Sequence, residues 1–149
     1  GWLVVATGLA GALSAAFWGT LSDRSSRLAM ALAAAMAGVL GLAVLAALTL
    51  APGATEGILF YALVLFLLNI AHAGVRIGRK THVVDIAGGE RKAEYVALSN
   101  SIIGVLLLLV GGLVSILMAF GLEVAIGVLS VLSLLGAAMA MTMKHAQED

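Results

Sequence analysis

The chain has 149 residues, of which 62% are hydrophobic and 11% charged, and its formal net charge is zero. A soluble domain carries about 25% charged residues, so this composition is far from that of a water-soluble protein. The absence of net positive charge argues against a nucleic acid as partner. The absence of cysteine excludes a disulfide framework, a thiol nucleophile and a thiolate metal site.

Five stretches of the sequence contain no Lys, Arg, Asp or Glu: residues 1–22, 28–55, 57–75, 95–122 and 124–143. Each is close to or longer than the roughly 20 residues that a helix needs to cross the hydrocarbon core of a bilayer. Their apolar residues do not alternate as in a membrane β-barrel strand, and a helix satisfies its backbone amides within its own segment. The sequence therefore predicts an all-α membrane protein, a single transmembrane domain whose five helices lie at about residues 2–21, 27–50, 57–80, 91–118 and 122–143.

The basic residues predict the orientation of these helices. All eight Lys and Arg lie in three places, residues 24–27, residues 76–92 and Lys144, whereas the two intervening connections contain acidic residues and no basic one. Because cytoplasmic loops carry the excess of Lys and Arg, we expect an integral protein of a bacterial cytoplasmic (inner) membrane, with these three places and the C-terminus inside. Trp18 and Tyr95 would then mark the inner interface. Five spans with the C-terminus inside place residue 1 outside, so we expect at least one further helix upstream.

Small residues spaced three or four apart predict where the first two helices pack, because such residues let membrane helices approach each other closely. The first helix has one such face and the second helix another. Their residues are Gly8, Ala12, Ala15, Ala16 and Gly19 on the first helix, and Ala34, Gly38 and Gly41 on the second.

The third helix carries a polar stripe in its inner half. At about 100° per residue, the stripe covers about 100° of arc; its members are Asn69, His72, Arg76, Arg79 and Lys80. Gly74 and Gly78 point the other way, as a packing edge. One interpretation is a basic strip that lines a cytoplasm-facing vestibule and attracts an anionic substrate. The alternative is that the basic side chains reach lipid phosphates as membrane anchors, and the sequence leaves both open.

The fourth helix follows a predicted break at residues 87–89. Glu90 and Glu94 suit its N-terminus because acidic groups there interact favourably with the helix dipole. Three polar residues, Ser99, Asn100 and Ser101, lie in its inner half. We expect hydrogen bonds between helices from this group, with Asn100 as a candidate substrate contact.

The hinge segment, residues 19–27, interrupts the apolar sequence between the first two helices. Its pattern Gly19-x-Leu21-Ser22-Asp23-Arg24-x-x-Arg27 resembles the cytoplasmic signature of major facilitator superfamily (MFS) transporters, which lies between the second and third helices of each half. Ser26 stands where that signature has a second glycine, and Leu28 where it has a final basic residue. Residues 82–91 and 95–100 look like the connection between the fourth and fifth helices of such a half. With the short tail, the resemblance implies spans eight to twelve, a partial six-helix MFS bundle and the C-terminal half of the transporter.

This resemblance implies a cytoplasmic gate or latch, whose residues here are Gly19, Asp23, Arg24, Arg27, Asp85 and Arg91. Gly19 would allow close packing, and Asp23 would accept the free N–H groups of the second helix. Arg24 and Arg27 would pair with acidic residues, for which Asp85, Glu90 and Glu94 are the candidates. Exposed ion pairs of this kind contribute about 0–1 kcal/mol each, which suits a contact that opens in every cycle.

The function implied is transport of a small solute by alternating access, with the lipid bilayer and the N-terminal half of the same transporter as partners. Candidate substrate-binding residues are Asn69, His72, Arg76, Arg79 and Asn100. We expect no enzymatic activity, metal or cofactor, because the sequence has no His-Glu-x-x-His, no Gly-x-Ser-x-Gly and no cysteine. The alternative is a membrane-embedded helical scaffold or assembly subunit without transport activity.

Overall fold

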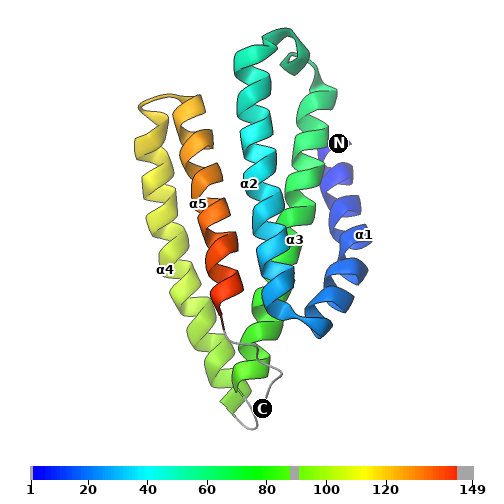
Figure 1. Ribbon diagram of the computed structural model, residues 1–149, viewed down its shortest axis with the longest axis vertical. Helices are drawn as coiled ribbons and strands as arrows, with labels where there is room; N and C mark the ends of the chain where they lie inside the picture. Colours follow the sequence, from blue (N-terminus) through cyan, green and yellow to red (C-terminus); the bar gives the residue numbers. More distant parts are fainter. Residues whose placement is uncertain (1, 88–90, 144–149) are drawn as a thin grey trace.

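A computed structural model describes residues 2–87 and 91–143 of the chain. These residues form five long α-helices joined by short connections, with one 3-10 helix and no strand, so the predicted all-helical fold is confirmed. Successive helices run up and down in one bundle (Figure 1). The elements are α1 (Trp2–Arg24), α2 (Ser26–Leu50), η1 (Pro52–Thr55), α3 (Ile58–Ala87), α4 (Lys92–Met118) and α5 (Leu122–Thr142).

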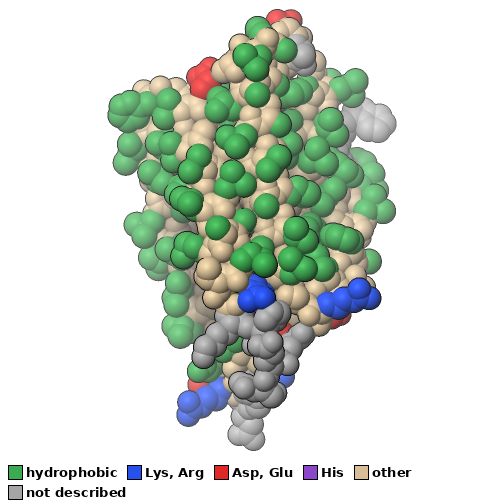
Figure 2. Space-filling model, viewed as in Figure 1, with side chains coloured by type: hydrophobic (Ala, Val, Ile, Leu, Met, Phe, Trp, Pro, Cys, Tyr) green, Lys and Arg blue, Asp and Glu red, His purple; other side chains and the backbone are tan. Residues whose placement is uncertain are grey.

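Four helices of the described chain, α2, α3, α4 and α5, are long and apolar enough to cross a membrane. Helix α1, predicted as a fifth span, is a 23-residue helix beside them, and its crossing stays a prediction. Figure 2 shows apolar side chains over most of the visible face of the bundle. Because a soluble protein rarely exposes so continuous an apolar surface, these helices indicate an integral membrane protein.

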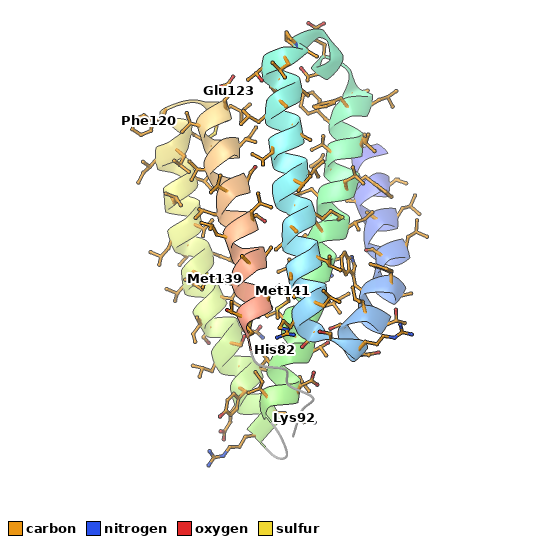
Figure 3. All side chains as sticks on the ribbon, in the orientation of Figure 1. His82, Lys92, Phe120, Glu123, Met139 and Met141 are labelled. Atoms are coloured by element: carbon orange, nitrogen blue, oxygen red, sulfur yellow. The ribbon has the colours of Figure 1, made fainter. Side chains whose placement is uncertain are left out.

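The two ends of the bundle differ. We call the end that contains the α1–α2 turn, residues 24–26, the hinge end, and the opposite end the far end. On the face seen in Figure 2, Lys and Arg side chains lie towards the hinge end. Figure 3 places Lys92 at the hinge end and Glu123 at the far end. That the hinge end faces the cytoplasm remains a prediction.

Helix α2 packs against α5 through the small residues that the sequence singled out. A Cβ atom added to Gly38 would lie 2.7 Å from the side chain of Leu134 and 2.9 Å from the backbone oxygen of Ser130, and one on Gly41 would collide with the Ser130 side chain. The hydroxyl of Ser133 donates a hydrogen bond of 2.8 Å to the carbonyl oxygen of Ala34. The predicted packing face of α2 is therefore confirmed.

Helix α3 packs against α1 and α2 through Gly74 and Gly78, as predicted. A Cβ atom on Gly74 would lie 2.6 Å from the Trp18 ring and 2.7 Å from the Cβ of Ala33. A Cβ atom on Gly78 would lie 2.8 Å from the Met30 side chain and 3.0 Å from the carbonyl oxygen of Ser26. Ring, helix backbone and alanine cannot move aside easily, so these positions require glycine.

Helix α1 packs through a different face from the predicted one. Its buried residues are Ala10, Ser14, Trp18 and Ser22. The small-residue face is exposed or half-exposed instead, and no atom lies within 4 Å of a Cβ built on Gly8 or Gly19. Within the described chain, the predicted packing of α1 through its glycines and alanines is wrong.

The reason is Trp18, which was also predicted wrongly as an interface residue. Its side chain is 3% exposed and lies against Gly74. The indole Nε1–H donates a hydrogen bond of 2.9 Å to the carbonyl oxygen of Ile70. A buried tryptophan needs both a space for its ring and an acceptor for its N–H. Helix α3 supplies both, and this contact determines which face of α1 turns inward.

Helix α4 is the least embedded of the helices. It contacts α3 and α5, but none of its residues is buried. A Cβ atom on Gly104, Gly111 or Gly112 would meet no atom within 4 Å. The close-packed part of the described chain therefore consists of α1, α2, α3 and α5.

Replacing Gly74 by alanine should destabilise the protein, because the added methyl group meets the Trp18 ring and Ala33. Overpacking of this kind costs about 1–3 kcal/mol. We expect the free energy of unfolding in mixed micelles to fall by that amount. Gly104→Ala is the matched control, since it adds the same group on a helix surface with open space and should be neutral or gain up to about 1 kcal/mol. Equal effects of the two substitutions would show that the Gly74 contact does not support the fold.

Candidate functional site

The polar stripe of α3 lies opposite its close-packed face. At about 100° per residue, Asn69, His72 and Arg76 fall within about 60° of one another, on the other side of the helix from Gly74 and Gly78. His72 and Arg76 are exposed, and Asn69 is half-buried. Because the glycine contacts fix the rotation of α3, the stripe lies outside the close-packed contact with α1 and α2, and Asn69 and His72 border a cavity that Ala37 of α2 also lines.

Neighbouring residues on α2 show how far the stripe extends from the hinge end. Gly78 lies against Ser26 and Met30, in the first turns of α2, whereas Asn69 and His72 share a cavity with Ala37. With a rise of about 1.5 Å per residue, Arg76 lies about 3 Å, His72 about 9 Å and Asn69 about 13 Å from the level of Gly78. If Gly78 lies at the boundary of a hydrocarbon core about 30 Å thick, Asn69 lies near the middle of that core.

Two adjoining cavities open beside the stripe. One has a volume of about 340 Å³ and is lined by Ala37, Leu68, Asn69, Ala71, His72 and Val75. The second, of about 330 Å³, lies between α2, α3 and α5 and shares Ala37 and Leu68 with the first. Its walls are apolar apart from Ser130 and Ser133, whose hydroxyls donate to backbone carbonyls of Ile126 and Ala34. The polar side chains of α3 therefore stand at the edge of an otherwise apolar recess.

Arg79 and Asn100 are placed differently from the rest of the predicted site. Arg79 is half-buried, and its Nη1 donates a hydrogen bond of 3.3 Å to the hydroxyl of Ser99 on α4. One of the expected hydrogen bonds between helices is thus present at Ser99, while Ser101 donates to the carbonyl of Ala97 in its own helix. Asn100 is exposed and outside the lining of both cavities. The structure does not bring Asn100 together with Asn69 and His72.

The hinge segment differs in one respect from its prediction. Helix α1 continues to Arg24, so Asp23 lies in its last turn, and the N-cap of α2 is Ser25, whose hydroxyl accepts from the N–H of Leu28 at 3.2 Å. The predicted capping of α2 by Asp23 is therefore wrong. A single residue in extended conformation separates the two helices, and serine takes that position readily.

The other residues of the predicted latch lie around the hinge end. Asp23 and Arg24 are exposed, and the Nη1 of Arg27 donates a hydrogen bond of 3.0 Å to the carbonyl oxygen of Met143, after the end of α5. Asp85 and Arg91 are exposed near the adjoining ends of α3 and α4, whereas Glu90 lies outside the described residues. The pairing of Arg24 or Arg27 with Asp85 or Glu94 stays a prediction.

A contact that the sequence did not predict joins α2 and α3 at the hinge end. The hydroxyl of Ser26 and the Nδ1 of His82 are 3.0 Å apart in a hydrogen bond, and both side chains are buried, at 5% and 4% exposure. Figure 3 shows His82 on α3 beside the start of α2. Ser26 stands at the position where the resemblance of the hinge segment to the MFS signature predicts a glycine. The spacing of Gly74, Gly78 and His82, each four residues apart, is the signal that could have placed His82 on the close-packed face.

Two further searches, for a metal site in the described part of the chain and for similar proteins, found nothing that assigns a function to the chain. Among the described residues, no group of three or more His, Asp or Glu side chains could hold a metal ion. Comparisons with protein-family models, with curated proteins and with solved structures found no match to this chain.

The hydrogen bond between Ser26 and His82 should give a measurable coupling in a double-mutant cycle. Ser26→Ala and His82→Ala should each lower the free energy of unfolding, and the double variant should lose less than the sum by about 1 kcal/mol, the usual range for such bonds between membrane helices. Ser101→Ala with His82→Ala is the control pair, because Ser101, among the described residues, donates its hydrogen bond to Ala97 of its own helix. That pair should be additive within about 0.5 kcal/mol. Additivity of the Ser26 and His82 substitutions would contradict the contact.

Proposed function

We propose that the chain belongs to a secondary transporter of the MFS type, which moves a small solute across the bilayer by alternating access. The main support is the division of α3 into two faces. One face is packed against α1 and α2 without room for a methyl group, and the other carries Asn69 and His72, which line a cavity, and Arg76 one turn nearer the hinge end.

Membrane depth makes this face costly unless it meets water or a ligand. Polar and ionisable side chains within a membrane span are expensive, and they generally face a bundle interior or a water-filled cavity. Asn69 satisfies part of its own demand by donating a hydrogen bond of 2.8 Å to the carbonyl oxygen of Leu65. His72 has no such bond within the described residues, so a hydrated recess is the simplest environment for it.

The packing of the bundle is also what alternating access requires. Transporters of this kind work by movement of one close-packed bundle against another around a central site. The contacts at Gly38, Gly41, Gly74 and Gly78 join α1, α2, α3 and α5 into one body. In the proposed orientation the hinge end is cytoplasmic, and Asp23 and Arg24 are exposed on that end. The resemblance of the hinge segment to the MFS signature agrees with this role.

The proposal can be tested through water access, because the chain has no cysteine and single cysteines can be introduced. We expect Asn69→Cys and His72→Cys, in membrane vesicles, to react with a membrane-impermeant thiol reagent. Leu108→Cys is the control. Leu108 is 78% exposed on α4. The hydrogen bond between Arg79 and Ser99 shows that these two residues lie at the same level of α3 and α4. Asn69 lies ten residues from Arg79 along α3, and Leu108 lies nine residues from Ser99 along α4 in the same direction. The two positions are therefore at similar depth.

A thiol in apolar surroundings is held in its unreactive protonated form, so Leu108→Cys should react at least about tenfold more slowly. For a transporter, the side of the membrane from which Asn69→Cys is labelled should also depend on the conformational state. Cysteines at residues 69 and 72 that are as unreactive as the one at residue 108 would overturn the proposal. The proposal would also be overturned if these cysteines reacted from the same side of the membrane in every conformational state, because the recess would then not change its exposure.

A further inference from the structure

We infer that the α3 polar face, defined as Asn69, His72 and Arg76, binds a small oxyanion such as a carboxylate or phosphate, and that this anion is the solute. The inference rests on the proposed transport function, because it names the substrate class of the same site. Four observations carry it: the charge of the face, the reach of its side chains, its hydrogen-bond donors, and the lining of the adjoining cavity.

Within the part of the chain that the structure describes, no acidic side chain forms an ion pair with the positive charge of the face. The guanidinium of Arg76 is permanently charged, and no hydrogen bond or ion pair joins it to any described residue. No acidic residue lies between residues 57 and 84, and the next one on α3, Asp85, is nine residues further along, or about 13 Å. The apolar parts of α1 and α2 contain no acidic residue either. An anion would supply the missing charge.

Binding to a lipid headgroup can explain the position of Arg76, but it cannot explain the positions of His72 and Asn69. With the hydrocarbon boundary placed at the level of Gly78, Arg76 lies about 3 Å inside it, and its long side chain reaches the headgroup region. His72 at about 9 Å and Asn69 at about 13 Å have side chains too short to do so. A ligand that contacts all three side chains has to enter the recess, which favours a solute over a lipid phosphate.

The hydrogen-bonding groups of the face are mainly donors. Arginine offers five N–H groups, and a neutral histidine offers one donor and one acceptor. The amide of Asn69 has two N–H donors, of which its bond to Leu65 uses one. Donors that include an ionised group form their strongest hydrogen bonds with carboxylate or phosphate oxygens. A cation would find only the carbonyl oxygen of Asn69 and one nitrogen of His72.

The cavity beside the face has room for a small ligand. Apart from Asn69 and His72, its lining consists of Ala37, Leu68, Ala71 and Val75, and Arg76 lies outside this lining, one helical turn nearer the hinge end than His72. A volume of about 340 Å³ is near the lower limit of the roughly 300–1,000 Å³ found for ligand sites, and the adjoining cavity of about 330 Å³ shares two lining residues with it. The lining contains no acidic or aromatic side chain that would favour a positive group.

The test measures anion binding by the purified full-length protein in a neutral detergent. Inorganic phosphate, sulfate and acetate are titrated separately, each replacing chloride at constant ionic strength. The midpoint temperature of thermal unfolding is measured, because a ligand that binds the folded state raises this temperature. We expect at least one of these anions to raise the midpoint temperature in a saturable way. Arg76→Gln and His72→Ala should weaken its apparent Kd about tenfold or more, as expected for loss of a charged or buried hydrogen bond.

The control is Lys92→Gln, which removes the same charge from an exposed residue at the start of α4 and should change the apparent Kd by less than about twofold. Arg76→Lys keeps the charge and should bind more tightly than Arg76→Gln. Since Arg76 is exposed, neither substitution of Arg76 should alter the midpoint of thermal unfolding measured without anion. A loss of binding in Lys92→Gln equal to that in Arg76→Gln would overturn the inference, because a general attraction between charges would then explain it.

A second arm separates a solute from a lipid. The protein is placed in nanodiscs of zwitterionic lipid, with or without anionic phosphatidylglycerol. If the midpoint temperature of unfolding rises only with the anionic lipid, and this rise depends on Arg76, the face binds lipid headgroups and the inference of a bound solute is overturned. The inference would also be overturned if anions changed the midpoint temperature of unfolding neither in detergent nor in nanodiscs. If Asn69→Cys and His72→Cys are accessible to water in alternate states but no anion binds, the transport proposal stands and the anion is wrong. If those cysteines are unreactive, the transport proposal itself has failed.

Discussion

The contact of Gly74 and Gly78 with α1 and α2 is the constraint on which the rest of the structure depends. At both glycines a single methyl group would collide with a tryptophan ring, an alanine, a methionine or helix backbone. Between helices in lipid there is little hydrophobic drive, so close approach of this kind is what holds them together. It also fixes the rotation of α3 about its axis. Once that rotation is set, the direction of every other side chain on α3 follows from the helical repeat, including that of Asn69, His72 and Arg76.

The sequence predicted those parts of the fold that a repeat within one helix determines. The packing of Gly38, Gly41, Gly74 and Gly78 followed from small residues three or four apart, and the polar stripe from the same periodicity. The same reasoning failed for α1, which has small residues on more than one side. There, the buried face depends on Trp18, and Trp18 is buried because α3 offers a space at Gly74 and an acceptor at Ile70. A preference that depends on a second helix cannot be read from the first.

Similar limits apply to the candidate site and to the hinge. The side chains of the α3 polar face could be predicted from the helical repeat. The cavity beside them could not, because Ala37 of α2 also lines it, and the sequence does not say which residue of α2 lies level with Asn69 and His72. In the hinge segment, Ser26 looked like a weakened match to the MFS signature. Its bond to His82, 56 residues away in the sequence, gives the serine a structural reason. A glycine there would leave the buried Nδ1 of His82 without this partner, which costs about 1–3 kcal/mol. Ser26 and His82 therefore belong together as a buried pair.

These contacts also limit how the α3 polar face can change its exposure. Rotation of α3 about its own axis would drive Gly74 and Gly78 out of their contacts, break the bond from Trp18 to Ile70, and separate Ser26 from His82. All of these lie along one side of α3, from the hinge end to the middle of the helix. A movement that preserves them carries α1, α2 and α3 together, and α5 with them through Gly38 and Ser133. If the face is presented to the two sides of the membrane in turn, the packing therefore requires a rigid-body movement of these helices, because turning α3 alone would expose buried polar groups at several points at once.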